Sequence, residues 1–135
     1  MRIIPHLSFN GQCEEAFRLY KECLAGQITL MLTYGGSPMA DANPELAEKI
    51  VHATLKVGDQ VITGADVPPN RYERPQGFAV QLNIDNADEA ERVFNAFAEG
   101  GTVLVALQKT FWTDRYGVVT DRFGTPWEIN CTAVG

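Results

Sequence analysis

The feature that most constrains this chain is an internal repeat. A shift of 74 residues places Glu14 and Ala16 on Asp88 and Ala90, and places Tyr20 on an aromatic residue of the second half. The order of one strand, one helix and three strands can also be read in both halves. Agreement between residue matches and element order is stronger evidence than either alone. The repeat therefore predicts an α+β fold of two βαβββ modules with eight strands, against the alternative of two unrelated strand-helix units.

The first half carries its elements between residues 1 and 66. Asn10 is the expected cap of a helix that Gly26 ends. The Gly, Ser and Pro content of residues 35–44 predicts a loop, followed by one helical turn over 45–49. The remaining expected elements are a strand over 3–9, the helix over 12–24, a strand over 28–34 and a hairpin of strands 51–57 and 60–65.

A proline-containing segment, residues 67–76, predicts a linker because proline cannot continue the interior of a sheet. After it the pattern begins again, with Asp85 or Asn86 as the expected helix cap. We expect one domain, residues 1–135, with a first module over 1–66 and a second over 77–135. The second module is expected to hold strands 78–84, 103–108, 116–120 and 127–132 and a helix over 87–98.

Composition limits the partners of the chain. A net charge of −6 and a pI near 4.8 argue against nucleic acid and anionic membranes, which attract clustered basic residues. No apolar run reaches the roughly 18 residues of a membrane span, and no signal-peptide pattern is present at the start. We therefore expect a cytoplasmic, soluble protein. Cys13, Cys23 and Cys131 form an odd set without metal-site spacing, which predicts packing roles.

Alternation along the strands predicts which side chains face away from the helices. In the first strand Leu7 and Phe9 form the apolar face, which leaves the residues between them on the other. The same alternation applies to the strands that begin near residues 51, 78 and 127. If each sheet curls, this second face lines a pocket for a ligand. The polar residues expected there are His6, Ser8, His52, Gln81, Asn83, Glu128 and Asn130.

Three runs of sequence carry a resemblance to a known family. IPHLSFNGQCEEAFRLYKECLAG, IVHATLKVGD and FWTDRYGVVTDRFGTPWEIN resemble the PhnB-like subfamily of the vicinal oxygen chelate superfamily, which includes glyoxalase, bleomycin-resistance and extradiol dioxygenase proteins. The resemblance covers nearly the whole chain. It implies two βαβββ modules, a cleft between curved sheets that holds a small molecule, and a homodimer.

The resemblance also implies where a divalent metal would bind. Enzymes of the superfamily hold it with four side chains, usually His and Glu, on the first and last strands of each module. Glu128 matches the last-strand position, and the first-strand position falls on Pro5 or His6. The equivalent in the second module falls on Ala79, and residues 60–65 contain no His or Glu. His6 and Glu128 are thus the candidate metal ligands, with His52 as a further donor, and the site is expected to be incomplete.

The loop before the seventh strand is the last candidate region. Trp112 is expected to contact a ligand, whereas Arg115 is expected to pair with Asp114 or Asp121 and hold the loop. Family names also mention a methyltransferase, but no strand, Gly-rich turn and helix of a doubly wound cofactor site occurs.

Three functions remain open. The sequence favours a small-molecule binding protein without a complete metal site. The alternative is a divalent-metal-dependent lyase, isomerase or dioxygenase acting on a small oxygen-rich substrate. The third is a dimeric accessory subunit.

Overall fold

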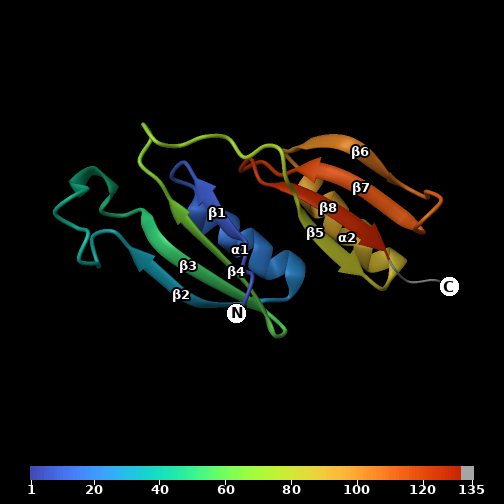
Figure 1. Cartoon of the computed structure of the whole chain (residues 1–135), viewed down its shortest axis with the longest axis horizontal. Helices are drawn as coiled ribbons and strands as arrows, with labels where there is room; N and C mark the ends of the chain where they lie inside the picture. The colour runs from blue at the N-terminus through green and yellow to red at the C-terminus, as the bar shows by residue number, and fades with distance from the viewer. Residues whose placement is uncertain (132–135) are drawn as a thin grey trace. The chain divides into compact units, whose positions relative to one another are not determined.

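The computed structural model describes residues 1–131, and the chain divides into two compact units, Met1–Glu73 and Arg74–Gly135. Within the described residues each unit contains one four-stranded mixed sheet and one α-helix in the order βαβββ (Figure 1). The predicted α+β fold of two such modules with eight strands is confirmed. The predicted linker, residues 67–76, spans the boundary between the units. Thr132, the expected end of the last strand, lies outside the described residues.

In the first unit the strand order is β1-β4-β3-β2, with β1 parallel to β4 and the other pairs antiparallel. The first strand begins three residues later than predicted, after Pro5, because proline has no N–H to donate to the ladder. The carbonyl of Pro5 still accepts a bond from the N–H of Thr63, 3.0 Å away. The elements are β1 (His6–Phe9), α1 (Cys13–Leu24), β2 (Gln27–Thr33), the 3₁₀ turn η1 (Pro44–Leu46), β3 (Ile50–Val57) and β4 (Gln60–Asp66).

The start of α1 is held by a distant carboxylate. The prediction that Asn10 caps this helix is wrong. Gln12 is the residue before the helix, and its side chain makes no capping hydrogen bond. Buried Asp66 instead accepts hydrogen bonds from the backbone N–H groups of Cys13, at 3.0 Å, and Ile50, at 2.9 Å. A carboxylate at a helix N-terminus is favoured by the helix dipole and by the unpaired N–H groups there. Asp66 therefore joins β4, α1 and β3.

One face of this sheet packs on α1. Leu7, Phe9 and Leu55 are almost fully buried there with Phe17 and Tyr20 of the helix. The Phe9 and Phe17 rings meet edge to face with centroids 6.1 Å apart. The predicted apolar face is therefore the covered one, which leaves the other face of the sheet for the polar side chains of the same strands.

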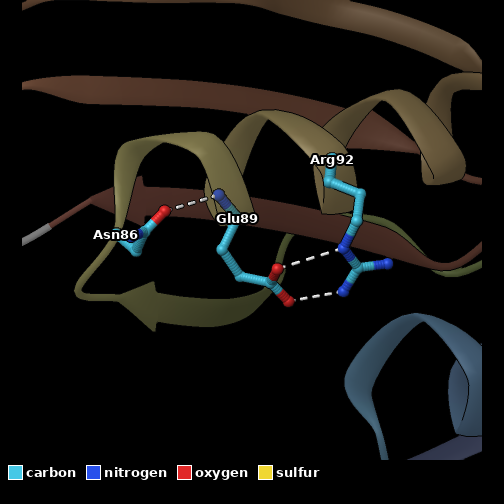
Figure 2. Close-up of polar contacts among 3 residues, drawn as sticks. All are labelled: Asn86, Glu89 and Arg92. Atoms are coloured by element: carbon cyan, nitrogen blue, oxygen red, sulfur yellow. Dashed lines mark hydrogen bonds and ion pairs between the residues drawn. The ribbon is translucent and has the colours of Figure 1, made fainter.

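The second unit repeats this arrangement with the strand order β5-β8-β7-β6 and β5 parallel to β8. Its helix spans the predicted residues, and Asn86 caps it by accepting a hydrogen bond from the N–H of Glu89, at 2.9 Å (Figure 2). The Glu89 carboxylate in turn accepts from the Arg92 guanidinium, which lowers the pKa of Glu89. The elements are β5 (Val80–Ile84), α2 (Ala87–Ala98), β6 (Thr102–Gln108), β7 (Arg115–Thr120) and β8 (Pro126–Cys131).

A buried aspartate also organises the second unit, but at a turn. Asp121 accepts hydrogen bonds from the N–H groups of Phe123 and Thr125 and from the indole N–H of Trp127, at 2.9, 3.0 and 2.8 Å. Trp127 is fully buried and stacks on Phe97 of α2, with centroids 4.6 Å apart. Asp121 thus holds the β7–β8 turn and orients a core tryptophan. No helix of residues 1–131 combines the length and apolar character that membrane crossing requires.

The pairing registers refine the repeat. His6 lies opposite Thr63, and Gln81 lies opposite Glu128, each across a parallel pair. The shift of 74 residues fits the helices but would place His6 on Val80, whose side chain has the opposite facing. A one-residue change of register moves a side chain to the other face of a sheet. On the open face of β5 the residue nearest to this position is therefore Gln81 rather than Val80.

Candidate ligand-binding faces

The open face of the first sheet is the one opposite α1, and it carries two histidines. The imidazoles of His6 and His52 are nearly parallel, with centroids 6.2 Å apart. Nδ1 of His6 lies 2.8 Å from the hydroxyl of Thr63, and Nε2 of His52 lies 3.4 Å from that of Thr54. The two hydroxyls are directly opposite each other on β4 and β3. Two imidazoles and two hydroxyls thus form one cluster on β1, β4 and β3.

The electrostatics of this cluster favour a neutral imidazole. Burial lowers the pKa of His6 below its usual range, and the neighbouring His52 lowers it further. In a neutral imidazole one ring nitrogen donates and the other accepts, so Nε2 of His6, the nitrogen that does not bond Thr63, can serve a ligand. Ser8, also predicted for this face, is half-buried on β1 opposite Ala65.

The open face of the second sheet carries a row of carboxamides. Asn130 of β8 donates from Nδ2 to Oδ1 of Asn83, its partner on β5, at 3.0 Å. Gln81 donates to the same Asn83 oxygen at 3.4 Å. Asn130 is only 9% exposed, and its Oδ1 has no hydrogen-bond partner among residues 1–131. Such a buried acceptor is unusual, because buried polar atoms are nearly always bonded.

An acidic and aromatic group adjoins the carboxamides. Tyr116 lies opposite Asn130 on β7, and burial together with a hydrogen bond to Glu128 raises the pKa of its hydroxyl. The ring of Trp112 meets Tyr116 edge to face at 5.2 Å and remains 54% exposed. The loop between β6 and β7 is closed by a hydrogen bond from the N–H of Thr110 to the carbonyl of Thr113. Trp112 is therefore an exposed ring on a short, hydrogen-bonded loop.

The predicted candidates divide between the two units. His6, Ser8 and His52 belong to the first, whereas the carboxamides, Glu128 and Trp112 belong to the second. Their roles in binding stay predictions, as does joint coordination by His6 and Glu128. Of the two partners predicted for Arg115, the structure shows Asp114. The Arg115 guanidinium donates a hydrogen bond to the backbone carbonyl of Asp114 at 2.9 Å. Sequence reasoning missed Thr63, because only strand register shows which residue lies beside His6.

The donor set does not fit the four-ligand metal site of the superfamily. No three His, Cys, Asp or Glu side chains gather as a metal site within the described residues. In the first unit the residue opposite His6 is a threonine, and in the second unit the residue opposite Glu128 is a glutamine. Hydroxyl and amide groups are weak ligands for ions such as Zn²⁺ and Ni²⁺ beside imidazole and carboxylate.

The cysteines also belong to the packed interior. Cys13, Cys23 and Cys131 are all buried. Burial raises the pKa of the Cys13 thiol, and the charges of Asp66 and Glu14 raise it further. A thiol in that state is a poor nucleophile and a poor metal ligand.

Two βαβββ units, each with a helix on one face and polar side chains on the other, define a glyoxalase-like fold. Solved structures of glyoxalase and bleomycin-resistance family proteins share this fold, at identities that show the fold alone. The chain belongs to the PhnB-like family, because the family model described as 3-demethylubiquinone-9 3-methyltransferase matches residues 1–130. The resemblance read from the sequence is therefore confirmed.

Individual relatives support this assignment. Protein YjdN of Escherichia coli K12 is 30% identical, over 96% of this chain and 95% of the relative. The solved structure of PA1353 from Pseudomonas aeruginosa is 45% identical with a TM-score of 0.89, covering 97% of both chains. The PhnB protein from Bacillus cereus is 22% identical with a TM-score of 0.82, covering 98% of this chain and 100% of its own, and shows the fold alone.

Proposed function

We propose that this PhnB-like protein binds a small organic molecule on the open faces of its sheets, without a complete divalent-metal site. The observation that carries the proposal is the unpaired Oδ1 of Asn130, in a residue only 9% exposed. Leaving a buried acceptor unbonded costs about 1–3 kcal/mol, so a face with a purely structural role would be expected to satisfy it. A ligand N–H that reaches this covered oxygen, after a small shift of the side chains around it, would recover that free energy.

The alternative is a metal-dependent lyase, isomerase or dioxygenase. It needs at least three strong ligands around one ion, and the opposing Thr63 and Gln81 replace two of them. Methyl transfer, named in the description of the family, is not part of the proposal. Each sheet is mixed, with a single parallel pair, whereas the doubly wound cofactor fold is built on parallel strands.

Metal analysis and ligand screening test the proposal. Protein purified without a histidine tag should contain far less than one metal ion per chain, and Mn²⁺, Ni²⁺ or Zn²⁺ should not raise its melting temperature. Members of a fragment library should raise it and shift the side-chain NMR signals of the open faces. Stoichiometric metal that is lost on replacing His6 and Glu128 would establish the alternative instead.

We also propose a homodimer, which the family resemblance implies. The strands β2 and β6 each lie at one edge of their sheet, and they expose the apolar side chains of Leu30, Val103 and Leu104. Exposed apolar residues on an edge strand favour association. Light scattering after size exclusion should report a dimer, and Leu104→Glu should shift it toward monomer. A monomeric native chain would contradict this proposal.

A further inference from the structure

We propose that the open face of the second unit selects a flat, ring-containing compound that donates N–H hydrogen bonds and is neutral or cationic, rather than an anionic oxyacid. This inference rests on the proposed function and names its ligand class. Three features of the face support it: an unpaired acceptor, its charge and an exposed aromatic ring.

The unpaired acceptor sets the polarity of the hydrogen bond that the ligand must make. The Nδ2 group of Asn130 is bonded to Oδ1 of Asn83, and that oxygen also accepts from Gln81. The chain of amide bonds therefore leaves Oδ1 of Asn130 as the remaining group, and no described residue donates to it. A ligand N–H would satisfy this oxygen once the side chains that cover it shift, whereas a carboxylate or phosphate would bring a second acceptor against it.

The charge of the face acts in the same direction. Glu128 lies two residues from Asn130 on the same face of β8, and it interacts with the hydroxyl of Tyr116. The residue opposite Glu128 on β7 is Val118, which carries no charge. The paired positions of β5, β8 and β7 on this face, as far as the structure describes them, hold no Lys or Arg. An anion would therefore meet a carboxylate without a compensating cation, whereas an amidinium or ammonium group would be attracted.

The aromatic group sets the shape of the ligand. Trp112 is 54% exposed while one part of its ring contacts Tyr116. The hydroxyl of Thr113 donates to the carbonyl of Cys131 on β8, which fixes the loop to the same sheet. An exposed indole held beside a polar face offers a surface on which a planar ring can stack, and it attracts cations as well.

Three compounds of one shape test this inference: benzamidine, benzamide and benzoate. They carry a cationic donor, a neutral donor and an anionic acceptor on the same ring. Each is titrated into the ¹⁵N-labelled full chain, following the side-chain amide of Asn130 and the indole of Trp112. We expect benzamidine to bind most tightly and benzoate to bind at least about tenfold more weakly than benzamide.

Variants identify the acceptor. Asn130→Leu should weaken benzamidine and benzamide at least about tenfold, whereas Asn130→Asp keeps an acceptor and should retain benzamidine. Asn95→Leu removes an exposed amide from α2 and should change nothing. The backbone amide spectrum of each variant reports whether it folds. If Asn130→Leu does not fold, Asn83→Ala serves as a second probe of the carboxamide row.

Two results would overturn the inference. In the first, benzoate binds as tightly as benzamide, or Asn130→Leu binds benzamidine unchanged. In the second, none of the three compounds shifts Asn130 or Trp112. If the broader fragment screen still finds ligands on the open faces, the proposed function stands and only the ligand class is wrong. If that screen also finds none, both fail.

Discussion

The two units share one scaffold but present different chemistry on their open faces. The first unit places two imidazoles beside two hydroxyls, whereas the second places carboxamides beside a carboxylate and aromatic rings. The strand pairing is the same in both, since the first strand runs parallel to the last. The repeat therefore fixes positions on a sheet, while the residues at those positions decide what each face can bind.

The covered faces differ less, although their anchoring aspartates lie at different places. Asp66 joins the start of α1 to the start of β3, and Asp121 closes the turn before β8. Both are nearly inaccessible to solvent. In each unit a buried carboxylate thus stabilises the packing on the helix, Asp66 through the start of α1 and Asp121 through Trp127.

The largest expected effect is at Asp121. Asp121→Ala leaves two backbone N–H groups and the indole N–H of Trp127 without this acceptor, so the free energy of unfolding should fall by about 3 kcal/mol or more. Asp66→Ala removes an acceptor from two N–H groups and should cost about 2 kcal/mol. Urea unfolding measures both, with exposed Asp85→Ala as a control near zero. A larger loss at Asp66 would reverse this ranking of the two anchors.

The next effect tests whether the helices pack equally tightly in both units. A Cβ at Gly64 would lie 2.7 Å from the ring of Phe17, and one at Gly117 would lie 2.7 Å from the ring of Phe94. Gly64→Ala and Gly117→Ala should each destabilise the chain by about 1–3 kcal/mol through overpacking. Thermal unfolding measures the loss, and Phe17→Leu should recover part of it for Gly64→Ala alone. Loss at only one site would show that the two helix interfaces are not equivalent.

The covered faces could be predicted from sequence better than the open ones. Alternation identified Leu7 and Phe9 as buried, and the local cap Asn86 marked the start of α2. The start of α1 was predicted with the wrong cap, because Asp66 comes from a strand far along the chain and no local pattern shows it. The pairing of His6 with Thr63 escaped prediction for the same reason: register depends on long-range contacts.

A smaller effect concerns the acidic group of the second unit. Burial first, and then Glu128, raise the pKa of Tyr116. Glu128→Gln removes the negative charge and should lower that pKa toward its usual value, while burial keeps it raised. Ultraviolet titration, corrected with Tyr116→Phe, follows the ionisation. An unchanged pKa would show that Glu128 does not interact with the hydroxyl in solution, which would remove one support for the selection of donor ligands.

The smallest effect concerns the imidazoles of the first unit. The folded-state pKa of His6 is lowered, so the folded chain binds fewer protons than the unfolded chain as the pH falls below about 6.5. Stability contributed by neutral His6 is therefore complete above that pH and decreases as the pH falls toward the lowered folded pKa. His52→Asn removes the second cause of the lowering, so the pKa of His6, measured by NMR, should rise but stay below its usual value. The hydroxyls of Thr63 and Thr54, the other groups at the rings, carry no charge. A pKa of His6 that falls in His52→Asn would show that the stacked rings interact by something other than charge repulsion.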